Sequence, residues 1–138
     1  MTERMTPPPR PPALDPEALA PVRGSGYPEP FRSRMGERSK RRLGEALGLT
    51  QFGVNLVTLG PGGQSALRHW HTQEDEFVFV LQGELVLVTD AGEQRLTAGM
   101  CAGYPAGRPD GHHLINRSGA PARYLEIGSR RPGDAAFY

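Results

Sequence analysis

The sequence contains little of what cross-links or anchors many proteins. It has one cysteine, Cys101, so no disulfide can form within the chain, and one lysine, Lys40. Apolar residues make up only 37% of the chain, and no run approaches the ~18 apolar residues that a membrane-spanning helix needs. No apolar stretch of about 7–15 residues follows the start, as a secretory signal would require. We therefore expect a cytoplasmic protein with no membrane partner.

Glycine and proline, in contrast, are abundant, with 18 and 14 among 138 residues. This share excludes a long-helix or coiled-coil protein. Most of the prolines lie near the N-terminus, where Pro7–Pro12 favours polyproline II or disorder because successive prolines fix φ and remove amide donors. Asp15 and Pro16 are suited to cap and start one helical turn. We predict a Pro-rich extended or partly disordered arm over residues 1–38 and a β-barrel domain over residues 39–138.

Charge is divided along the chain. Residues 1–42 carry nine basic and five acidic side chains, a net charge of +4, whereas residues 43–138 carry seven and ten, a net charge of −3. The basic cluster Arg38–Arg42 invites a nucleic-acid interpretation. A pI near 8.0, the single lysine and the lack of a helix-turn-helix pattern argue against it. We expect no nucleic-acid partner and interpret the cluster as a solvated edge strand or a lip that faces an anion.

Beyond residue 50 the apolar residues alternate with a period near two, and Gly- or Pro-rich turns interrupt them at short intervals. This pattern is typical of short strands, and no segment predicts a helix of about ten residues or more. It favours an all-β sandwich or barrel with one core and a small site. The predicted strands are Gln51–Leu59, Ser65–His71, Glu76–Leu81, Glu84–Thr89, Glu93–Leu96, Met100–Tyr104, His112–Asn116 and Arg123–Ile127.

All four histidines fall in two clusters, His69 with His71, and His112 with His113. His69 and His71 lie two residues apart and so share one face of a strand. Glu76 follows on the next predicted strand. Two imidazoles and a carboxylate from adjacent strands suit a first-row transition metal, and a third histidine from a distant strand would complete the site.

The spacing of these residues resembles the first motif of the cupin superfamily. From Gly63 the chain has five residues, His69-Trp70-His71, four residues, Glu76, six residues and Gly83, which matches that motif without a gap. The distance to Gly83 favours Glu76 as the carboxylate ligand. The neighbouring carboxylates that it disfavours are Glu74 and Asp75.

A second cupin motif follows, in Gly99, Pro105, Gly107, His112 and Asn116. Four residues separate His112 from Gly107 where the motif has two, while Asn116 keeps its spacing. The extra pair is Pro109-Asp110, and it makes His113 a competing ligand, although strand alternation places His113 on the opposite face. The resemblance covers most of the body of the chain.

The resemblance implies a double-stranded β-helix, the jelly-roll barrel of the cupins, with one divalent transition metal inside it. The ligands it implies are His69, His71, Glu76 and His112. Metals that suit them are Mn, Fe, Ni, Co, Cu or Zn. The alternative is that the motif persists as a fold signature without a metal.

A metal site with open coordination positions can act as a Lewis acid on a small oxygen-rich molecule. The segments Arg38–Leu59 and His112–Ser118 also resemble small bacterial cupins often named sugar-phosphate isomerases, and cupins include dioxygenases. The second hypothesis is a non-catalytic module in which the metal anchors a small ligand or the fold. Activity or its absence is therefore left open, and no catalytic residue is assigned.

An isomerase of sugar phosphates would present a cation to the phosphate. Lys40 is one candidate, and the others are Arg41, Arg42, Arg108, Arg117 and Arg123. No general base beyond the metal ligands is evident. Tyr104, before the loop at residues 105–111, is a candidate contact to the ligands or the substrate.

Residues near the motifs are expected mainly to pack. Arg68 and Trp70 alternate with the histidines and should face away from the metal. Trp70 and the Phe77/Phe79 pair are predicted to be packing residues, either within the chain or at a subunit interface. We expect a homodimer formed by sheet-to-sheet packing. Cys101 is predicted to be a small buried apolar residue. The final pair, Phe137-Tyr138, needs a surface to pack on.

Overall fold

The computed structural model describes residues 11–138, so most of Pro7–Pro12 and the rest of the first ten residues lie outside the described part. Short strands dominate, as predicted. The elements are η1 (Pro16–Ala18), β1 (Val22–Arg23), α1 (Phe31–Arg34), β2 (Arg38–Arg42), α2 (Leu43–Ala46), β3 (Phe52–Leu59), β4 (Trp70–His71), β5 (Glu76–Gln82), β6 (Glu84–Thr89), β7 (Gly92–Thr97), β8 (Cys101–Tyr104), β9 (His113–Ile115), β10 (Ala122–Ser129) and β11 (Ala136–Phe137).

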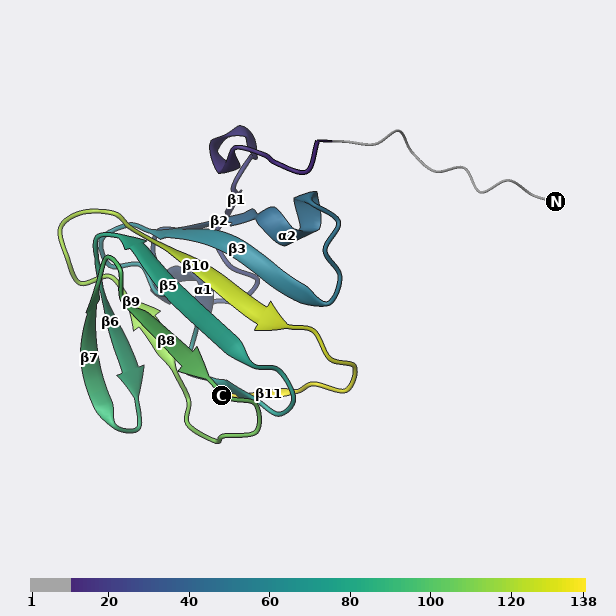
Figure 1. The fold of residues 1–138 in the computed structure, drawn as a ribbon. Coiled ribbons are helices and arrows are strands. Elements are labelled where there is room, and N and C mark those ends of the chain that lie inside the picture. The colour runs from purple at the N-terminus through teal and green to yellow at the C-terminus, as the bar shows by residue number, and fades with distance from the viewer. Residues whose placement is uncertain (1–10) are drawn as a thin grey trace.

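These strands form a β-barrel with two main walls (Figure 1). One wall is an antiparallel sheet of order β1-β2-β3-β10-β5-β8, and the other has the order β7-β6-β9. Strand β11 pairs with β4 near the C-terminus. The predicted all-β jelly-roll barrel is confirmed. Within residues 11–138, none of the helices has the length and apolar character needed to cross a membrane.

The predicted strands are confirmed to within two residues at each end, except for Ser65–His71, of which only Trp70–His71 is a strand. Gln64 bridges to Ile115 and His69 bridges to His112. The chain from Gln64 to His69 therefore has more residues than the paired chain from His112 to Ile115. The additional residues cannot pair with the neighbouring strand, so the strand is interrupted just before His69.

Strand register explains which side chains face the barrel interior. Val57, Tyr124 and Val80 lie opposite one another across β3, β10 and β5, and all three are buried. Full burial of an aliphatic side chain such as Val57 or Val80 stabilises the fold by about 1.5–3 kcal/mol. Glu76 lies two residues before Val78 on this inner face. The fold therefore places the predicted carboxylate ligand at one end of the core.

The Arg38–Arg42 cluster does form a strand, but it is not a solvated edge along its whole length. β1 pairs with it at Ser39 and Lys40, and four of its five residues are partly buried. Lys40 lies opposite Val57 and so faces the interior, whereas Arg41 lies opposite Leu56 and faces out. The only lysine of the chain therefore points into the barrel.

Several residues of the segment 11–37 contact the barrel. The carboxylate of Asp15 accepts a hydrogen bond from the Glu17 amide at 3.0 Å, which confirms the predicted helical turn. Glu17 in turn forms ion pairs with Arg41 at 3.4 Å and Arg123 at 2.6 Å. Met35 is 1% exposed, so the segment contributes to the core. The division of the chain at residue 38 stays a prediction.

Two motif glycines are required by the backbone. Gly83 has a φ of +82°, and a Cβ there would lie 2.8 Å from the Pro121 carbonyl oxygen. A Cβ at Gly63 would lie 2.3 Å from the Glu37 carbonyl oxygen. Both positions need a residue without a side chain, because the backbones approach too closely for any other.

Cys101 is exposed, so the prediction that it is buried is wrong. It lies opposite Phe79 on the outer face of the six-stranded sheet. Its neighbours Ala102 and Tyr104 pack against the core instead. Residue type alone favours burial of a cysteine, but side chains alternate between the two faces along β8, and this alternation places Cys101 on the outer face.

Candidate metal centre

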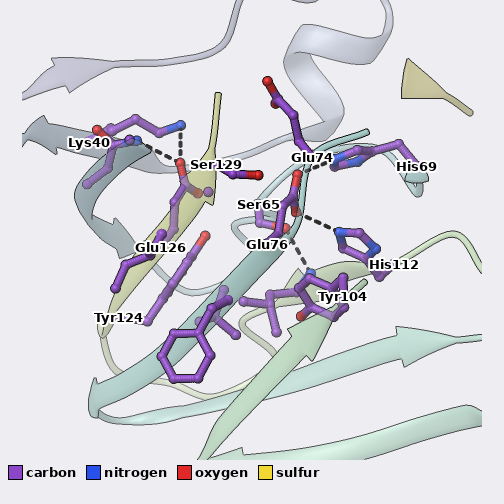
Figure 2. A pocket seen from close by; sticks show the side chains of 18 of the residues that line it. Lys40, Ser65, His69, Glu74, Glu76, Tyr104, His112, Tyr124, Glu126 and Ser129 are labelled. Carbon is purple, nitrogen blue, oxygen red and sulfur yellow. Dashed lines mark hydrogen bonds and ion pairs between the residues drawn. The ribbon is translucent and has the colours of Figure 1, made fainter. Parts of the chain in front are cut away.

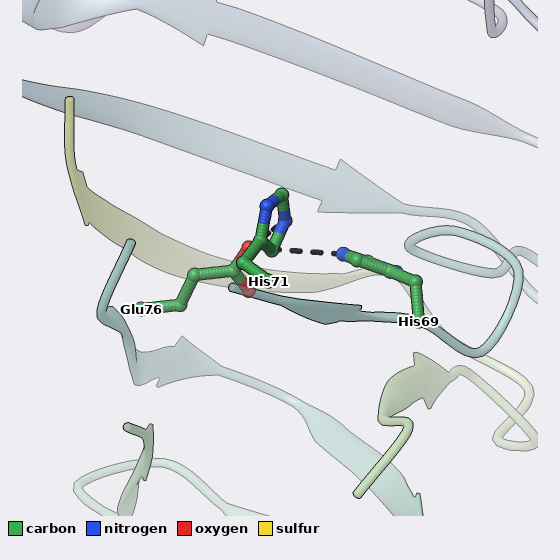
Figure 3. A group of neighbouring side chains, drawn as sticks. All are labelled: His69, His71 and Glu76. Carbon is green, nitrogen blue, oxygen red and sulfur yellow. Dashed lines mark ion pairs between the residues drawn. The ribbon is translucent and has the colours of Figure 1, made fainter. Parts of the chain in front are cut away.

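Four predicted ligands converge at one end of the barrel. Oε1 of Glu76 lies 2.7 Å from Nε2 of His71 and 3.7 Å from Nε2 of His69 (Figure 3). Oε2 of Glu76 lies 2.8 Å from Nε2 of His112. Ligand atoms of His69, His71 and Glu76 all lie within 4.8 Å of one another, a spacing that one ion could span. We call these four residues the His/Glu cluster.

The geometry separates His112 from its neighbour His113. His112 is 5% exposed, and its ring centroid lies 4.9 Å from that of His69. The Nδ1 atom of His113 instead lies 3.0 Å from the Ala66 carbonyl oxygen, away from Glu76. The geometry thus favours His112 despite the two-residue insertion before it, and its role as a ligand stays a prediction.

Hydrogen bonds behind the histidines orient two of the rings. Nδ1 of His69 lies 2.8 Å from the Leu67 carbonyl oxygen, and Nδ1 of His71 lies 2.7 Å from Oδ2 of Asp134. An N–H donated at Nδ1 leaves a lone pair on Nε2 of a neutral ring. Two such lone pairs directed at the Glu76 carboxylate repel it unless a proton or a cation lies between them. The donor set therefore fits a divalent transition metal.

The pKa values also reflect this crowding. Burial opposes ionisation of Glu76, but its interactions with His112 and His69 outweigh it and hold its pKa far below the usual range. Burial would lower the pKa of His69, yet its interaction with Glu76 and its hydrogen bond to the Leu67 carbonyl give a net raised pKa. Glu76 is therefore a carboxylate at neutral pH, ready to bind a cation.

Asp134 is a site residue that the sequence did not reveal. Besides His71, its carboxylate accepts hydrogen bonds from the Gln73 and Glu74 amides at 2.9 and 3.1 Å, and so holds the turn between His71 and Glu76. Asp134 lies 63 positions from His71 in sequence. The β11–β4 pairing brings it close, and no motif spacing marks it. Together with His71 and Glu74 it forms a second group of potential ligand atoms.

Tyr104 lies directly against the cluster, as its position before the loop suggested. Its ring stacks on His112 with centroids 3.6 Å apart and an angle of 7° between the planes. Burial, with the nearby Glu76 charge, raises its pKa well above the usual value. Its buried hydroxyl has no hydrogen-bond partner among residues 11–138. It stays a protonated donor that a bound molecule could use.

Two cavities meet at the His/Glu cluster. One has a volume of about 310 Å³ and is lined by His69, Glu76 and His112 on one side and Lys40, Tyr124 and Glu126 on the other (Figure 2). The other has about 330 Å³ and is lined by Trp70, His71, Cys101 and Arg108 among others. Glu76, Tyr104 and His112 line both. A small molecule in either cavity would contact the cluster.

Most cations proposed for a phosphate face elsewhere. Arg41 and Arg123 pair with Glu17, Arg117 pairs with Glu93, and Arg42, more than half exposed, pairs with Glu45. Lys40 and Arg108 remain, one in each cavity. Arg38, which sequence reasoning did not single out for this role, joins Lys40 in the first cavity.

The neighbours of the first motif pack as expected, with one addition. Arg68 is bound to the Gly111 carbonyl and to Asp90, and takes no part in the cluster. Trp70 stacks on Phe137 with centroids 5.0 Å apart, which supplies the surface expected for the C-terminal pair. Trp70 also lines the second cavity.

Tyr138 lies beside one histidine of the cluster. Its ring centroid lies 5.6 Å from that of His69. Its hydroxyl lies 3.3 Å from that of Tyr27. Burial and this hydrogen bond raise the pKa of Tyr27 to about 12, so the Tyr27 hydroxyl stays protonated at neutral pH.

Known proteins resemble the chain both in sequence and in structure. A sugar phosphate isomerase of the cupin superfamily from Silicibacter pomeroyi is 50% identical, with a TM-score of 0.89 over 92% of this chain and 81% of that one. A protein from Acidithiobacillus ferrooxidans, provisionally named a sugar phosphate isomerase, is 30% identical, with a TM-score of 0.71 over 75% of this chain and 65% of that one.

More distant structures share the fold alone. A salicylate 1,2-dioxygenase from Pseudaminobacter salicylatoxidans is 19% identical, with a TM-score of 0.56 over 64% of this chain and 26% of that one. Among curated protein sequences, none matches the chain significantly. The family model of the cupin domain matches residues 55–128, more than half of the chain and both predicted motifs from His69 to Asn116. The chain therefore belongs to the cupin superfamily.

Proposed function

We propose that this cupin binds one divalent transition metal through His69, His71, Glu76 and His112. The observation that carries the proposal is the convergence of three imidazole Nε2 atoms on the two oxygens of one carboxylate. When bound, the metal would supply Lewis-acid chemistry, polarising a carbonyl or acidifying a hydroxyl. Its identity among Mn, Fe, Ni, Co, Cu and Zn is left to measurement.

The chain's own residues would prepare the site for such a group. Asp134 and the Leu67 carbonyl hold the rings of His71 and His69 so that Nε2 faces inward. Tyr104 covers one face of His112 and excludes water from it. Its hydroxyl would donate a hydrogen bond to an oxygen of a bound molecule. These contacts support a preorganised site.

We further propose that the ligand is a small oxygen-rich molecule and that the reaction resembles that of a sugar-phosphate isomerase. The 50% identity to the Silicibacter pomeroyi protein of that name supports this reaction over a dioxygenase. The volume of the first cavity, about 310 Å³, suits a molecule of that size. The second candidate is a non-catalytic module that binds the same kind of ligand, because single-domain cupins need not be enzymes.

The test combines metal analysis with activity assays. Protein purified without added metal is analysed for metal content and then assayed with a panel of sugar phosphates, and for oxygen consumption. We expect His71→Ala to lose the metal and the activity. The matched control is His113→Ala, which removes a nearby histidine outside the cluster. Activity unchanged in His71→Ala would refute a metal-dependent enzyme, and ligand binding without turnover would favour the non-catalytic module.

We also propose that the protein forms a homodimer through the outer face of the six-stranded sheet. Phe52, Phe77 and Leu81 lie on that face and are 40%, 38% and 46% exposed. Ile127 lies opposite Phe77 and continues the patch. Contiguous exposed apolar surface of this kind marks interaction sites. Sedimentation of the full chain should give twice the monomer mass of 15.0 kDa, and a monomer mass would contradict the proposal.

The cytoplasm is the proposed location. Cys101 is a free, exposed thiol, which a reducing compartment keeps from oxidising. Fractionation of cells that express the full chain would test this, with the cytosolic fraction as the expected result.

A further inference from the structure

The inner face of β2 presents two cations to the cavity beside the His/Glu cluster. Arg38 lies opposite Leu59 and Lys40 opposite Val57, and both Leu59 and Val57 are core residues. Arg38 and Lys40 line the cavity of about 310 Å³ together with His69 and Glu76. Arg41, the residue after Lys40, faces out and pairs with Glu17. Cations on the core side of a strand need a specific counterpart.

Lys40 is only partly satisfied by the protein. Its Nζ lies 2.7 Å from Oε1 of Glu126, and the Asn55 side-chain amide donates to the same oxygen at 2.9 Å. An ammonium group has three N–H donors, so two remain for a ligand. The Lys40 side chain is 21% exposed, which keeps these donors accessible from the cavity.

Arg38 lacks a carboxylate partner altogether among residues 11–138. Its Nη1 donates to the Gly24 carbonyl at 3.2 Å, whereas its Nε is buried without a hydrogen-bond partner in the described chain. A buried guanidinium N–H without an acceptor is costly, and an acceptor on a ligand would recover that cost. The Tyr124 hydroxyl, also buried and unpartnered, lines the same cavity.

The carboxylates of this cavity are already engaged. Glu126 pairs with Lys40, Glu76 lies within 2.8 Å of Nε2 of His71 and of His112, and Glu74 accepts from the Arg131 amide at 3.1 Å. The guanidinium of Arg130 adds a further positive group at Gly53. The cavity lining carries three cations and three carboxylates, but Arg38 forms no ion pair with a carboxylate of residues 11–138, so its guanidinium remains available to an anion.

We propose that Arg38 and Lys40 form a subsite for an oxyanion, a phosphate or carboxylate group on the molecule whose other oxygens face the His/Glu cluster. The link to the cluster rests on the proposed function, but the subsite itself needs no metal. Arg38 would donate its Nε–H and Lys40 its two remaining N–H groups to the anion. The pair would select charged over neutral sugars or acids.

The experiment titrates inorganic phosphate into the full chain, stripped of metal with a chelator, and follows binding by calorimetry. We expect saturable binding of one phosphate per chain. Lys40→Gln and Arg38→Gln should each weaken it by about tenfold or more, the effect of one charge-assisted hydrogen bond. Arg41→Gln, which changes an outward-facing cation of the same strand, should bind as tightly as the wild type.

Further arms identify the source of the anion. Glucose 6-phosphate, gluconate and uncharged glucose are titrated in the same way, and tighter binding of one of the two anions names the substituent. Arg38→Gln leaves the Lys40–Glu126 pair intact, so the test holds even if Lys40→Gln does not fold. Equal binding by wild type and Arg38→Gln, or no saturable binding at millimolar phosphate, would overturn the proposal.

Loss of the subsite and loss of the metal centre are distinguishable. His71→Ala should lose metal binding and keep phosphate binding within about twofold, because its side chain lies outside the anion cavity. A wild type that binds metal but no phosphate refutes the subsite alone. A wild type that binds phosphate but no metal refutes the proposed metal centre alone.

Discussion

Asp134 offers a sharp test of how the proposed metal centre is held together. The variant Asp134→Asn keeps the size of the side chain but leaves a single acceptor oxygen. In the wild type one oxygen accepts from His71 at 2.7 Å while the other accepts from the Gln73 and Glu74 amides at 2.9 and 3.1 Å. Asparagine cannot serve both sides, because its amide nitrogen only donates. Either the His71 ring or the turn before Glu76 must lose its partner.

The expected effects on metal affinity and on stability are similar in free energy. Loss of a carboxylate behind a histidine ligand lowers metal affinity about 10–100-fold, or ~1.4–2.8 kcal/mol. The free energy of unfolding of the metal-free protein should fall by about 1.5–3 kcal/mol, the contribution of a hydrogen bond to a charged group. Competition with a chromogenic chelator measures the first quantity, and urea unfolding measures the second.

The matched control is Asp90→Asn. Asp90 also pairs with a cation, Arg68, at 2.7 Å, but its side chain is 67% exposed and forms no hydrogen bond with a histidine of residues 11–138. A surface pair contributes about 0–1 kcal/mol, so both measurements should stay near the wild type. Asp134→Asn with wild-type metal affinity, in a protein whose metal binding still needs His71, would refute the reasoning about the carboxylate.

Three further predictions follow from the same structure. Because the pKa of His69 is raised, its protonation stabilises the metal-free protein at pH below the pKa of an unfolded histidine, about 6.5, and this contribution is lost as pH rises through the raised pKa. The metal-bound protein should show the opposite trend, since a histidine that binds a metal must be neutral. Parallel pH profiles of thermal unfolding with and without metal would contradict this. Gly83→Ala should lower the free energy of unfolding by about 1–3 kcal/mol, because φ is +82° and the Pro121 carbonyl is close, and an unchanged urea midpoint would show that the turn can adapt. Tyr124→Phe should leave the metal-free protein as stable as the wild type or more so, because the buried hydroxyl has no partner among residues 11–138, and a loss of more than about 1 kcal/mol in urea unfolding would reveal a partner, such as water.

Much of the barrel could be predicted because its strands carry recognisable local patterns. Loose alternation along Phe52–Leu59 and the run of β-branched and aromatic residues in Phe77–Leu81 indicate strands directly. The break before His69 could not be predicted, since its cause is the unequal advance of two paired segments. β2 carries charge on both faces, so no alternation of polarity marks which of its residues turn inward. Register against β3, rather than residue type, directs Lys40 into the barrel.

The candidate site divides in the same way. The grouping of His69, His71 and Glu76 could be predicted from local spacing, because these residues lie at the end of one strand segment and the start of the next. His112 needed the motif as well as strand parity, and the structure places it against Glu76 at 2.8 Å. Asp134, Glu126 and Arg38 depend on long-range pairing of strands, for which a single sequence carries no local signal. The prediction that Cys101 is buried was wrong for the same reason, since the register of β8 against β5 determines which face of the sheet the Cys101 side chain occupies.

Metal content measures the central claim most directly. The wild type, His71→Ala and His113→Ala are purified without added metal, exposed to equimolar Mn, Fe, Co, Ni, Cu and Zn at neutral pH, desalted and analysed by mass spectrometry of the elements. The account predicts one transition-metal ion per chain in the wild type and in His113→Ala, and a loss of most of it in His71→Ala. A wild type that retains no metal, or a His71→Ala variant that retains as much as the wild type, would contradict it.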